Sequence, residues 1–225
     1  MANVISEEQR NLNKSLHQDS GNFGNREDAA GFAKHLPQTL NRLHELGACD
    51  SFLDYGTGKG RLVSRLNAEC NPNINIQGYD PAVEKFSQKP NHSFDIVSCL
   101  DVLEHIEMAS IDAVLNDIFT LTNRFCYLVI DLQPAVKTMQ DGRNAHILLA
   151  PSEWWIARIS QLFPCINAFP AYHACGIPQK LVVTAAKSNE NLSIMYSFII
   201  KEDLFGQLMT GGVLHKKYKQ SIKSK

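Results

Sequence analysis

Apolar runs and polar breaks alternate along the chain at spacings that predict strands and helices in turn. Short apolar runs at 52–55, 74–79, 94–100 and 125–130 have the length of buried strands. Between them, apolar residues recur every three or four positions, as they do on one face of a helix. Strands that alternate with helices indicate an α/β domain, with a mainly parallel sheet and helices on both of its faces.

The predicted helices have recognisable starts and ends. A leucine repeat over 36–43 stops at Gly47, and glycine commonly closes helices. A second helix over 62–66 follows the first strand. Further along, Ser110 and Ser152 are the predicted caps of two more helices, because a serine side chain can accept a hydrogen bond from a free backbone N–H.

Two regions depart from this simple alternation. Only 13 residues separate Asp80 from Phe94, with prolines at 81 and 90, which leaves too little room for a helix and a further strand. One edge strand is therefore expected to be missing. Near the C-terminal end, apolar runs at 166–169 and 180–186 predict a final strand pair, with one antiparallel strand.

Residues with possible chemical roles gather where the first predicted strand ends. The segment DYGTGKG, residues 54–60, places an acid and three glycines between that strand and a helix. Glycines let a ligand lie against bare backbone near the positive end of a helix. Asp80 ends the next strand about twenty residues further on, where a carboxylate can accept hydrogen bonds from both hydroxyls of a ribose. Asp80-Pro81 could also simply begin a turn.

Two common kinds of nucleotide loop do not fit this segment. A dinucleotide-binding loop has the pattern G-x-G-x-x-G/A, but Arg61 stands at the position of the third glycine. The phosphate-binding pattern G-x-x-x-x-G-K-[ST] is absent as well. Asp54 would repel phosphates, whereas it suits an ammonium group. A ligand with a ribose, an amino-acid head and no phosphate is S-adenosylmethionine.

Two segments resemble one superfamily. Residues 54–60 are similar to motif I of the class I S-adenosylmethionine-dependent methyltransferases. Residues 94–106, FDIVSCLDVLEHI, resemble the later strand-and-helix motif, in a variant common in small-molecule O- and C-methyltransferases. The resemblance covers about residues 30 to 187 and implies a Rossmann-like fold with S-adenosylmethionine as cofactor. The implied cofactor contacts are Asp54, Tyr55, Gly56, Gly58, Asp80, Leu100 and Asp101.

The implied reaction is an in-line attack by an oxygen, nitrogen or carbon nucleophile on the sulfonium methyl group. The main work of the protein is then orientation and desolvation. A histidine near its free pKa could take the proton of the acceptor. His146, in the loop after the strand that ends at Asp131, is the first catalytic candidate and His105 is the second. Either could also be an ordinary histidine without a catalytic role.

A metal-assisted enzyme is the alternative. Asp101, Glu104, His105 and His146 resemble the Glu-x-x-Glu-His plus distant His arrangement of the small-RNA 3′-terminal 2′-O-methyltransferases. Two histidines and two carboxylates would suit Mn, Fe or Zn. However, Asp101 replaces the first Glu, and Asp-x-x-Glu before an apolar helix also matches a capping box. That local explanation accounts for two of the four residues, so no metal ligand is assigned.

Composition narrows the class of protein. With 225 residues and 44% apolar content, the chain can form one domain with a substantial core. The net charge of −1 speaks against nucleic acid or anionic lipid as a partner. No apolar run reaches membrane-spanning length, and a signal-peptide core is absent. Six isolated cysteines indicate reduced thiols and a cytoplasmic location.

Three regions are expected along the chain. We expect an N-terminal arm or cap in residues 1–30 and an S-adenosylmethionine-binding methyltransferase domain in 31–187. We expect an extension with a basic tail in 188–225. The expected acceptor is a small molecule or a saccharide, and the oligomeric state cannot be read from the sequence. Two other functions remain open: a non-catalytic S-adenosylmethionine-binding module, and a nucleotide-sugar or dinucleotide oxidoreductase, against which Arg61 speaks.

Overall fold

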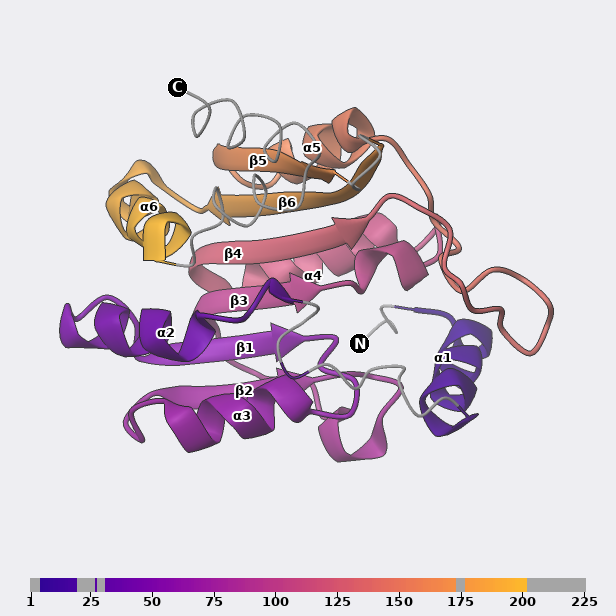
Figure 1. The fold of residues 1–225 in the computed structure, drawn as a ribbon, viewed down its shortest axis with the longest axis horizontal. Coiled ribbons are helices and arrows are strands. Elements are labelled where there is room, and N and C mark those ends of the chain that lie inside the picture. Colours follow the sequence, from indigo (N-terminus) through magenta and orange to yellow (C-terminus); the bar gives the residue numbers. More distant parts are fainter. Residues whose placement is uncertain (1–4, 20–26, 28–30, 173–176, 202–225) are drawn as a thin grey trace, which may run out of the picture.

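The computed structural model, which describes residues 5–19, 27, 31–172 and 177–201, contains one six-stranded sheet (Figure 1). The strands are β1 (Ser51–Tyr55), β2 (Asn75–Tyr79), β3 (Phe94–Leu100), β4 (Thr122–Asp131), β5 (Cys165–Tyr172) and β6 (Pro178–Ala186). Their order across the sheet is β2-β1-β3-β4-β6-β5. Strands β1 to β4 run parallel, and β6 is antiparallel to both of its neighbours. The predicted α/β class, with one antiparallel strand late in the chain, is confirmed.

Helices pack on both faces of this sheet, as predicted. The helices are α1 (Glu7–Asp19), α2 (Leu36–Glu45), α3 (Arg61–Glu69), α4 (Ile111–Leu121), α5 (Ser152–Ser160) and α6 (Leu192–Lys201). Helices α2, α3 and α6 share one apolar cluster with the sheet, while α4 and α5 share another on the opposite face. Helix α1 lies apart from both faces, beyond the ends toward which β1, β3 and β4 point (Figure 1).

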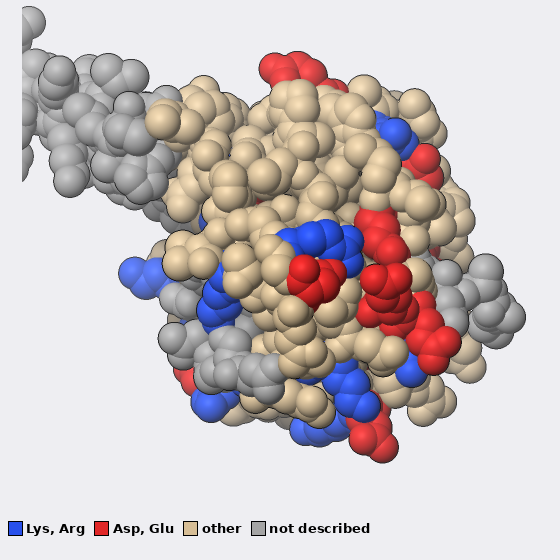
Figure 2. Space-filling view, turned by 90° about the vertical axis from the view of Figure 1, so that its right-hand side faces the viewer, with Lys and Arg blue, Asp and Glu red and all other residues tan. Residues whose placement is uncertain are grey.

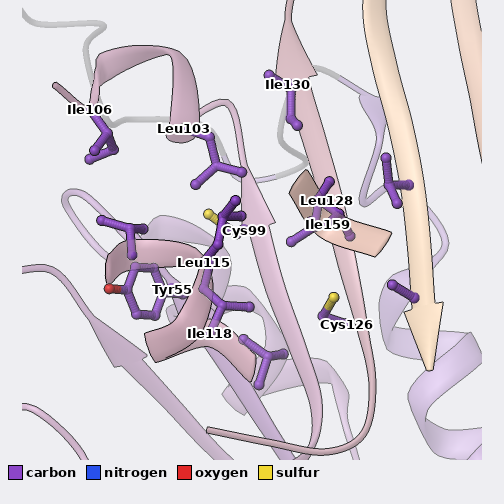
Figure 3. Packing of buried hydrophobic residues seen from close by; sticks show 14 of the residues in the cluster. Tyr55, Cys99, Leu103, Ile106, Leu115, Ile118, Cys126, Leu128, Ile130 and Ile159 are labelled. Carbon is purple, nitrogen blue, oxygen red and sulfur yellow. The ribbon is translucent and has the colours of Figure 1, made fainter. Parts of the chain in front are cut away.

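The apolar cluster beneath α4 fixes the turn that follows β3. Leu103 and Ile106 project from this turn into the same cluster as Leu115 and Ile118 of α4 (Figure 3). Leu103 is fully buried and Ile106 is nearly so. Because the two apolar side chains hold the turn from below, the residues between them, Glu104 and His105, have defined positions at the end of the sheet.

One edge strand is missing, as the short segment after Asp80 predicted. Strand β2 forms one edge of the sheet. Between Tyr79 and Phe94 the structure has only the short 3-10 helix η2 (Glu84–Phe86) and irregular backbone. The chain therefore passes directly from the tip of β2 to the start of β3.

Three predictions about helix starts are wrong in detail. The expected helix after Leu100 is only the 3-10 helix η3 (Leu103–His105). Ser110 occupies the N-cap position of α4, but its side chain makes no capping hydrogen bond. Helix α5 begins at Ser152 itself, and Pro151, whose backbone is extended, occupies the N-cap position. The predicted basic tail lies outside the described residues.

Two findings bear on the predicted environment of the chain. In the described part of the chain, none of the helices combines the length and hydrophobicity that a membrane crossing requires. The cysteines at 49, 70, 99, 126 and 165 are free thiols, and Cys175 lies outside the described residues. Burial raises the pKa of Cys49 to about 12, which makes its thiol a poor nucleophile.

Candidate active site

The glycine loop after β1 requires residues without side chains. Gly56, Gly58 and Gly60 have φ values of 79°, 54° and 71°, in the left-handed region that other residues avoid. A Cβ atom on Gly56 would lie 2.4 Å from Cγ2 of Val102, in the turn after β3. On Gly60 it would lie 2.3 Å from the ring of Phe86. The loop is thus pressed between the turn after β3 and η2, and this packing requires glycine at both positions.

Asp80 closes the other side of this loop. Its Oδ2 accepts a hydrogen bond from the N–H of Gly58 at 2.9 Å, and its Oδ1 accepts one from the N–H of Ala82 at 2.9 Å. The second bond is a turn contact, so the structural role considered for Asp80 is real. A carboxylate offers about four acceptor positions, however, so these two hydrogen bonds leave room for further donors such as ribose hydroxyls. Nε2 of His17 is also near, 3.8 Å from Oδ2.

Asp54 is a buried acid beside the same loop. Its side chain is nearly inaccessible, and the Ser98 hydroxyl donates to its Oδ1 at 2.8 Å. Burial raises the pKa of Asp54 to about 6, although the hydrogen bond from Ser98 opposes this effect, and the nearby Asp80 carboxylate adds to it. A cationic group placed against Asp54 would lower this pKa again. The ammonium partner predicted for Asp54 from its place before the glycines stays a prediction.

Tyr55 and Leu100 lie near the loop in the chain, but their side chains pack in or against the apolar clusters of the sheet. The Tyr55 side chain lies in the core beneath α4, and its hydroxyl donates to Oδ2 of Asp117 at 3.0 Å (Figure 3). Leu100 ends β3 and packs against the apolar cluster of the opposite face. Only the backbone of Tyr55 is available to a ligand at the loop.

A buried lysine joins the tips of three strands on the other side of the site. Lys180, on β6, places its Nζ 2.5 Å from Oδ1 of Asp101 and 3.0 Å from Oδ2 of Asp131. Burial acts to lower the pKa of Lys180, but the two carboxylates more than offset this and raise it above its ordinary value. Asp101 itself has a φ of 55°, unusual for a residue other than glycine. Lys180 was not among the predicted site residues; its one signal is a cation at the start of the apolar run 180–186.

Glu104 does not act as a helix cap. Its side chain is fully buried, and Oε1 accepts a hydrogen bond from the N–H of Asp131 at 3.2 Å. Because Asp101 pairs with Lys180 instead, the capping-box interpretation of Asp101 and Glu104 is wrong. Oε2 of Glu104 has no hydrogen-bond partner among the described residues. Burial and the neighbouring Asp101 raise the pKa of Glu104 well above its ordinary value.

The two candidate histidines lie side by side. The rings of His105 and His146 have centroids 4.9 Å apart and meet at 76°. Nδ1 of His105 is 2.7 Å from the carbonyl oxygen of Ala145, and Nδ1 of His146 is 2.5 Å from that of Gln133. A carbonyl oxygen can only accept, so each Nδ1 carries the hydrogen. In a neutral ring with hydrogen on Nδ1, Nε2 is the nitrogen that accepts a proton or binds a metal.

The possible metal ligands form two overlapping groups. Glu104, His105 and His146 each have one ligand atom within 4.8 Å of the others. Asp101, Glu104 and Asp131 form a second such group. The set of four considered from the sequence is thus divided, with Asp101 held by Lys180. The two histidines and Glu104 alone provide a donor set that suits a first-row divalent cation.

All of these residues lie at one end of the sheet. Figure 2 looks onto the side of the molecule toward which the parallel strands point, and acidic side chains gather there beside lysines and arginines. The glycine loop, Asp54 and Asp80 belong to the β1–β2 part of this end. The histidines, Glu104 and Lys180 belong to the β3–β4–β6 part. In open α/β sheets this is the end where ligands bind.

Comparison with known proteins gives a family and a fold. Residues 25–168, more than half of the chain, match the sequence family described as "Methyltransferase domain". No curated protein sequence matches the chain.

Two solved structures share the fold. One is 1,6-didemethyltoxoflavin-N1-methyltransferase from Burkholderia thailandensis, with bound 1,6-didemethyltoxoflavin and S-adenosylhomocysteine. Its sequence is 14% identical and the TM-score is 0.52. The comparison covers 84% of this chain and 93% of that one. The other is magnesium protoporphyrin IX methyltransferase from Synechocystis PCC 6803, with bound S-adenosylmethionine. Its sequence is 15% identical and the TM-score is 0.51. The comparison covers 83% of this chain and 100% of that one.

Proposed function

This chain belongs to the methyltransferase domain family, within the class I S-adenosylmethionine-dependent methyltransferases, and we propose that it methylates an O, N or C nucleophile of a small molecule. The predicted superfamily, enzyme class and cosubstrate are confirmed by the family match. The proposal extends these findings to the residues and to the acceptor. One observation carries it: two strand-tip acids beside a glycine loop share one end of the sheet with a pair of histidines that backbone carbonyls orient through Nδ1.

The cofactor half of the proposal assigns one role to each acid. Asp54 pairs with the ammonium group of S-adenosylmethionine, because it is a buried acid whose raised pKa a cation would lower. Asp80 accepts hydrogen bonds from the ribose hydroxyls through acceptor positions that Gly58 and Ala82 leave open. The bare loop at 56–58 allows the amino-acid part to lie against the backbone.

The second half of the proposal concerns the acceptor and the group that takes its proton. The nucleophile of the acceptor attacks the methyl carbon while the carbon–sulfur bond breaks, and S-adenosylhomocysteine leaves as a neutral thioether. The proton of the acceptor passes to Nε2 of His146, with His105 as the second candidate. Both rings are held by backbone carbonyls, so they keep their orientation as the proton arrives. The two structural neighbours are named as methyltransferases of a toxoflavin precursor and of a porphyrin, which supports a small-molecule acceptor.

The test is a search for acceptor-dependent turnover. The purified chain is incubated with S-adenosylmethionine and a panel of hydroxylated, amine-bearing and saccharide compounds, and S-adenosylhomocysteine is measured by mass spectrometry. His146→Ala is expected to bind S-adenosylhomocysteine normally and to lose about 99% of turnover, since general-base catalysis contributes about 100-fold or more. His92→Ala, at an exposed histidine, serves as the matched control. Undiminished turnover in His146→Ala would remove this residue from the mechanism.

A metal-assisted reaction is the second candidate. The observation that favours it is the group of Glu104, His105 and His146, with Oε2 of Glu104 buried and without a partner in the described structure. A divalent cation there would act as a Lewis acid on the acceptor oxygen. Both histidines already donate their Nδ1–H to backbone carbonyls, which is how metal-binding histidines are usually oriented.

Metal content separates the two candidates. The metal-assisted candidate predicts one equivalent of Mn, Fe or Zn by elemental analysis after growth with metal, and its loss in Glu104→Gln with S-adenosylhomocysteine binding retained. Activity unaffected by a chelator, together with metal-free protein, would exclude this candidate and leave the metal-free base mechanism.

The remaining assignments are also proposals. We assign residues 31–187 to the S-adenosylmethionine-binding domain, 1–30 to an N-terminal cap and 188–225 to an extension. A saccharide remains a candidate within the small-molecule class. The near-neutral charge of −1 favours such an acceptor over nucleic acid, and the free thiols favour the cytoplasm. A non-catalytic S-adenosylmethionine-binding module would show cofactor binding with no turnover on any acceptor.

A further inference from the structure

Helix α1 belongs to this chain but not to the part that the family match covers. The match begins at residue 25, and α1 ends at Asp19. In Figure 1 the helix lies across the end of the sheet where the candidate site is, rather than on either face. One side of the helix carries the contacts, since Gln9, Asn13, Leu16 and His17 stand at positions i, i+4, i+7 and i+8. These contacts connect α1 to both halves of the site.

The first group of contacts reaches the segment that carries His105. Gln9 is almost completely buried, and its Nε2 donates to the carbonyl oxygen of His105 at 3.4 Å and to Oδ1 of Asn13 at 3.0 Å. Just before the helix, Ser6 donates from its backbone N–H and its hydroxyl to the Glu107 carboxylate, at 3.0 and 2.8 Å. The start of α1 is thus fixed to the turn after β3.

The second group of contacts reaches the loop that carries His146. Leu16, Met139 and Ala145 form a small buried apolar cluster of their own, separate from both main clusters. Nε2 of Gln9 also lies 3.7 Å from Sδ of Met139. The loop and α1 therefore cover each other, and Ala145 of this cluster is the residue whose carbonyl orients His105.

The third contact reaches the cofactor half. Nε2 of His17 lies 3.8 Å from Oδ2 of Asp80, and the side chains of the two residues are only 12% and 10% exposed. Gln9 and His17 are eight positions, or about 12 Å, apart along the helix. One helix therefore extends from the proposed base to the proposed ribose-binding acid.

We propose that α1 forms the outer wall of the methyl-transfer site and shields bound S-adenosylmethionine from solvent, with Gln9 as the positioning residue that holds the wall to His105. The inference rests on the proposed function, because it requires the cofactor at Asp54 and Asp80. It has a kinetic consequence. The contacts of Gln9 and His17 hold α1 over the site, so we expect α1 to slow the release of S-adenosylhomocysteine. Exclusion of water by a closing element also favours reactions of this kind.

Hydrogen exchange and release kinetics test the wall directly in the full-length chain. S-Adenosylhomocysteine is expected to slow amide exchange in residues 7–19 by about tenfold or more. Gln9→Ala is expected to speed release of S-adenosylhomocysteine about fivefold or more, measured by rapid mixing with a competing cofactor. Gln18→Ala is the matched control, because Gln18 is an exposed residue on the same helix. It is expected to behave as the wild type.

A second variant and a melting measurement separate a positioning role from simple stabilisation. His17→Ala acts at the opposite end of the contacts and is expected to speed release as well. A merely structural Gln9 would lower the melting temperature of the unliganded protein and leave the release rate unchanged. Normal binding of S-adenosylhomocysteine with unaltered exchange in α1 would overturn the wall and leave the proposed function intact. Absence of binding in the wild type would overturn both.

Discussion

The two halves of the candidate site are built in different ways. The cofactor half depends on missing side chains: three glycines in left-handed conformations and the close packing of Gly56 against Val102. The acceptor half depends on buried or partly buried polar side chains from three separate segments. Lys180, Glu104, His105 and His146 come from β6, the turn after β3 and the loop after β4.

This difference decides how each half tolerates change. Within a glycine loop, an added methyl group is the damaging change, because there is no space for it. Within a cluster of buried charges, removal of one member is damaging, since the remaining charges lose their partner. The cofactor half should therefore be sensitive to additions and the acceptor half to deletions.

The largest expected effect is the deletion of Lys180. Lys180→Met leaves the carboxylates of Asp101 and Asp131 without their shared cation, and we expect a loss of about 3–5 kcal/mol in the free energy of unfolding. Urea denaturation measures it. Arg42→Met is the control, because Arg42 is 51% exposed in its pair with Glu45 and should cost less than about 1 kcal/mol. Equal urea midpoints for Lys180→Met and wild type would contradict the importance of the cluster.

An addition in the glycine loop comes next. Gly56→Ala combines a left-handed backbone with a Cβ only 2.4 Å from Val102, so we expect a loss of about 2–4 kcal/mol in unfolding free energy and no detectable binding of S-adenosylhomocysteine. Gly47 has a similar φ of 66°, but open space surrounds the position of an added methyl group. The comparison variant is Gly47→Ala. It should cost about 1–2 kcal/mol and leave binding intact. Similar results for the two variants would remove the packing argument.

Asp54 gives the cofactor half a distinct pH dependence. Its pKa is raised from 3.8 to about 6 in the folded protein, so the ionised form is disfavoured by about 3 kcal/mol. The folded state therefore binds more protons than the unfolded state between these values, and the contribution of Asp54 to stability falls as pH rises from about 4 to about 6. The difference in melting temperature between wild type and Asp54→Asn across this range isolates the effect.

Ligand binding should show the opposite trend at the same residue. An ammonium group favours ionised Asp54, so the affinity for S-adenosylhomocysteine should rise about tenfold per pH unit up to about pH 6 and then level off. Calorimetry over this range measures it. A flat profile in the wild type would exclude Asp54 as the ammonium partner.

The smallest expected effect concerns Ser98. Ser98→Ala removes the 2.8 Å hydrogen bond to Asp54, and we expect a loss of about 1 kcal/mol in binding free energy for S-adenosylhomocysteine. The pH at which affinity levels off should also move upward, because the ionised carboxylate loses a donor. Ser160→Ala, at an exposed serine, is the control. An unchanged pH profile in Ser98→Ala would show that this hydroxyl does not tune Asp54.

The cofactor half could be predicted from sequence because its information is local. Seven consecutive residues carry the loop, and the short segment after Asp80 predicts the missing strand. The acceptor half could not be predicted in the same way. Asp101 and Glu104 have the spacing of a capping box, and only Lys180, 79 positions away from Asp101, shows that they serve another purpose. A lysine at the start of an apolar strand does not reveal which acids it will meet.

Helix α1 was predicted only as part of an N-terminal arm or cap, without its contacts. The side of the helix that faces the site carries Gln9, Asn13 and His17. Leu12 and Leu16 are its apolar residues at the small cluster with Met139, so apolar periodicity gives little signal.

The central claim is that the tips of β1 and β2 bind S-adenosylmethionine through Asp54 and Asp80. Calorimetric titration of S-adenosylhomocysteine into the wild type, Asp80→Asn and the exposed-site control Asp112→Asn tests it most directly. The predicted result is one binding site in the wild type and the control, with affinity reduced about 30-fold or more in Asp80→Asn, since a hydrogen-bonded charge is lost. Equal affinity in all three proteins, or no binding in any of them, would contradict the claim.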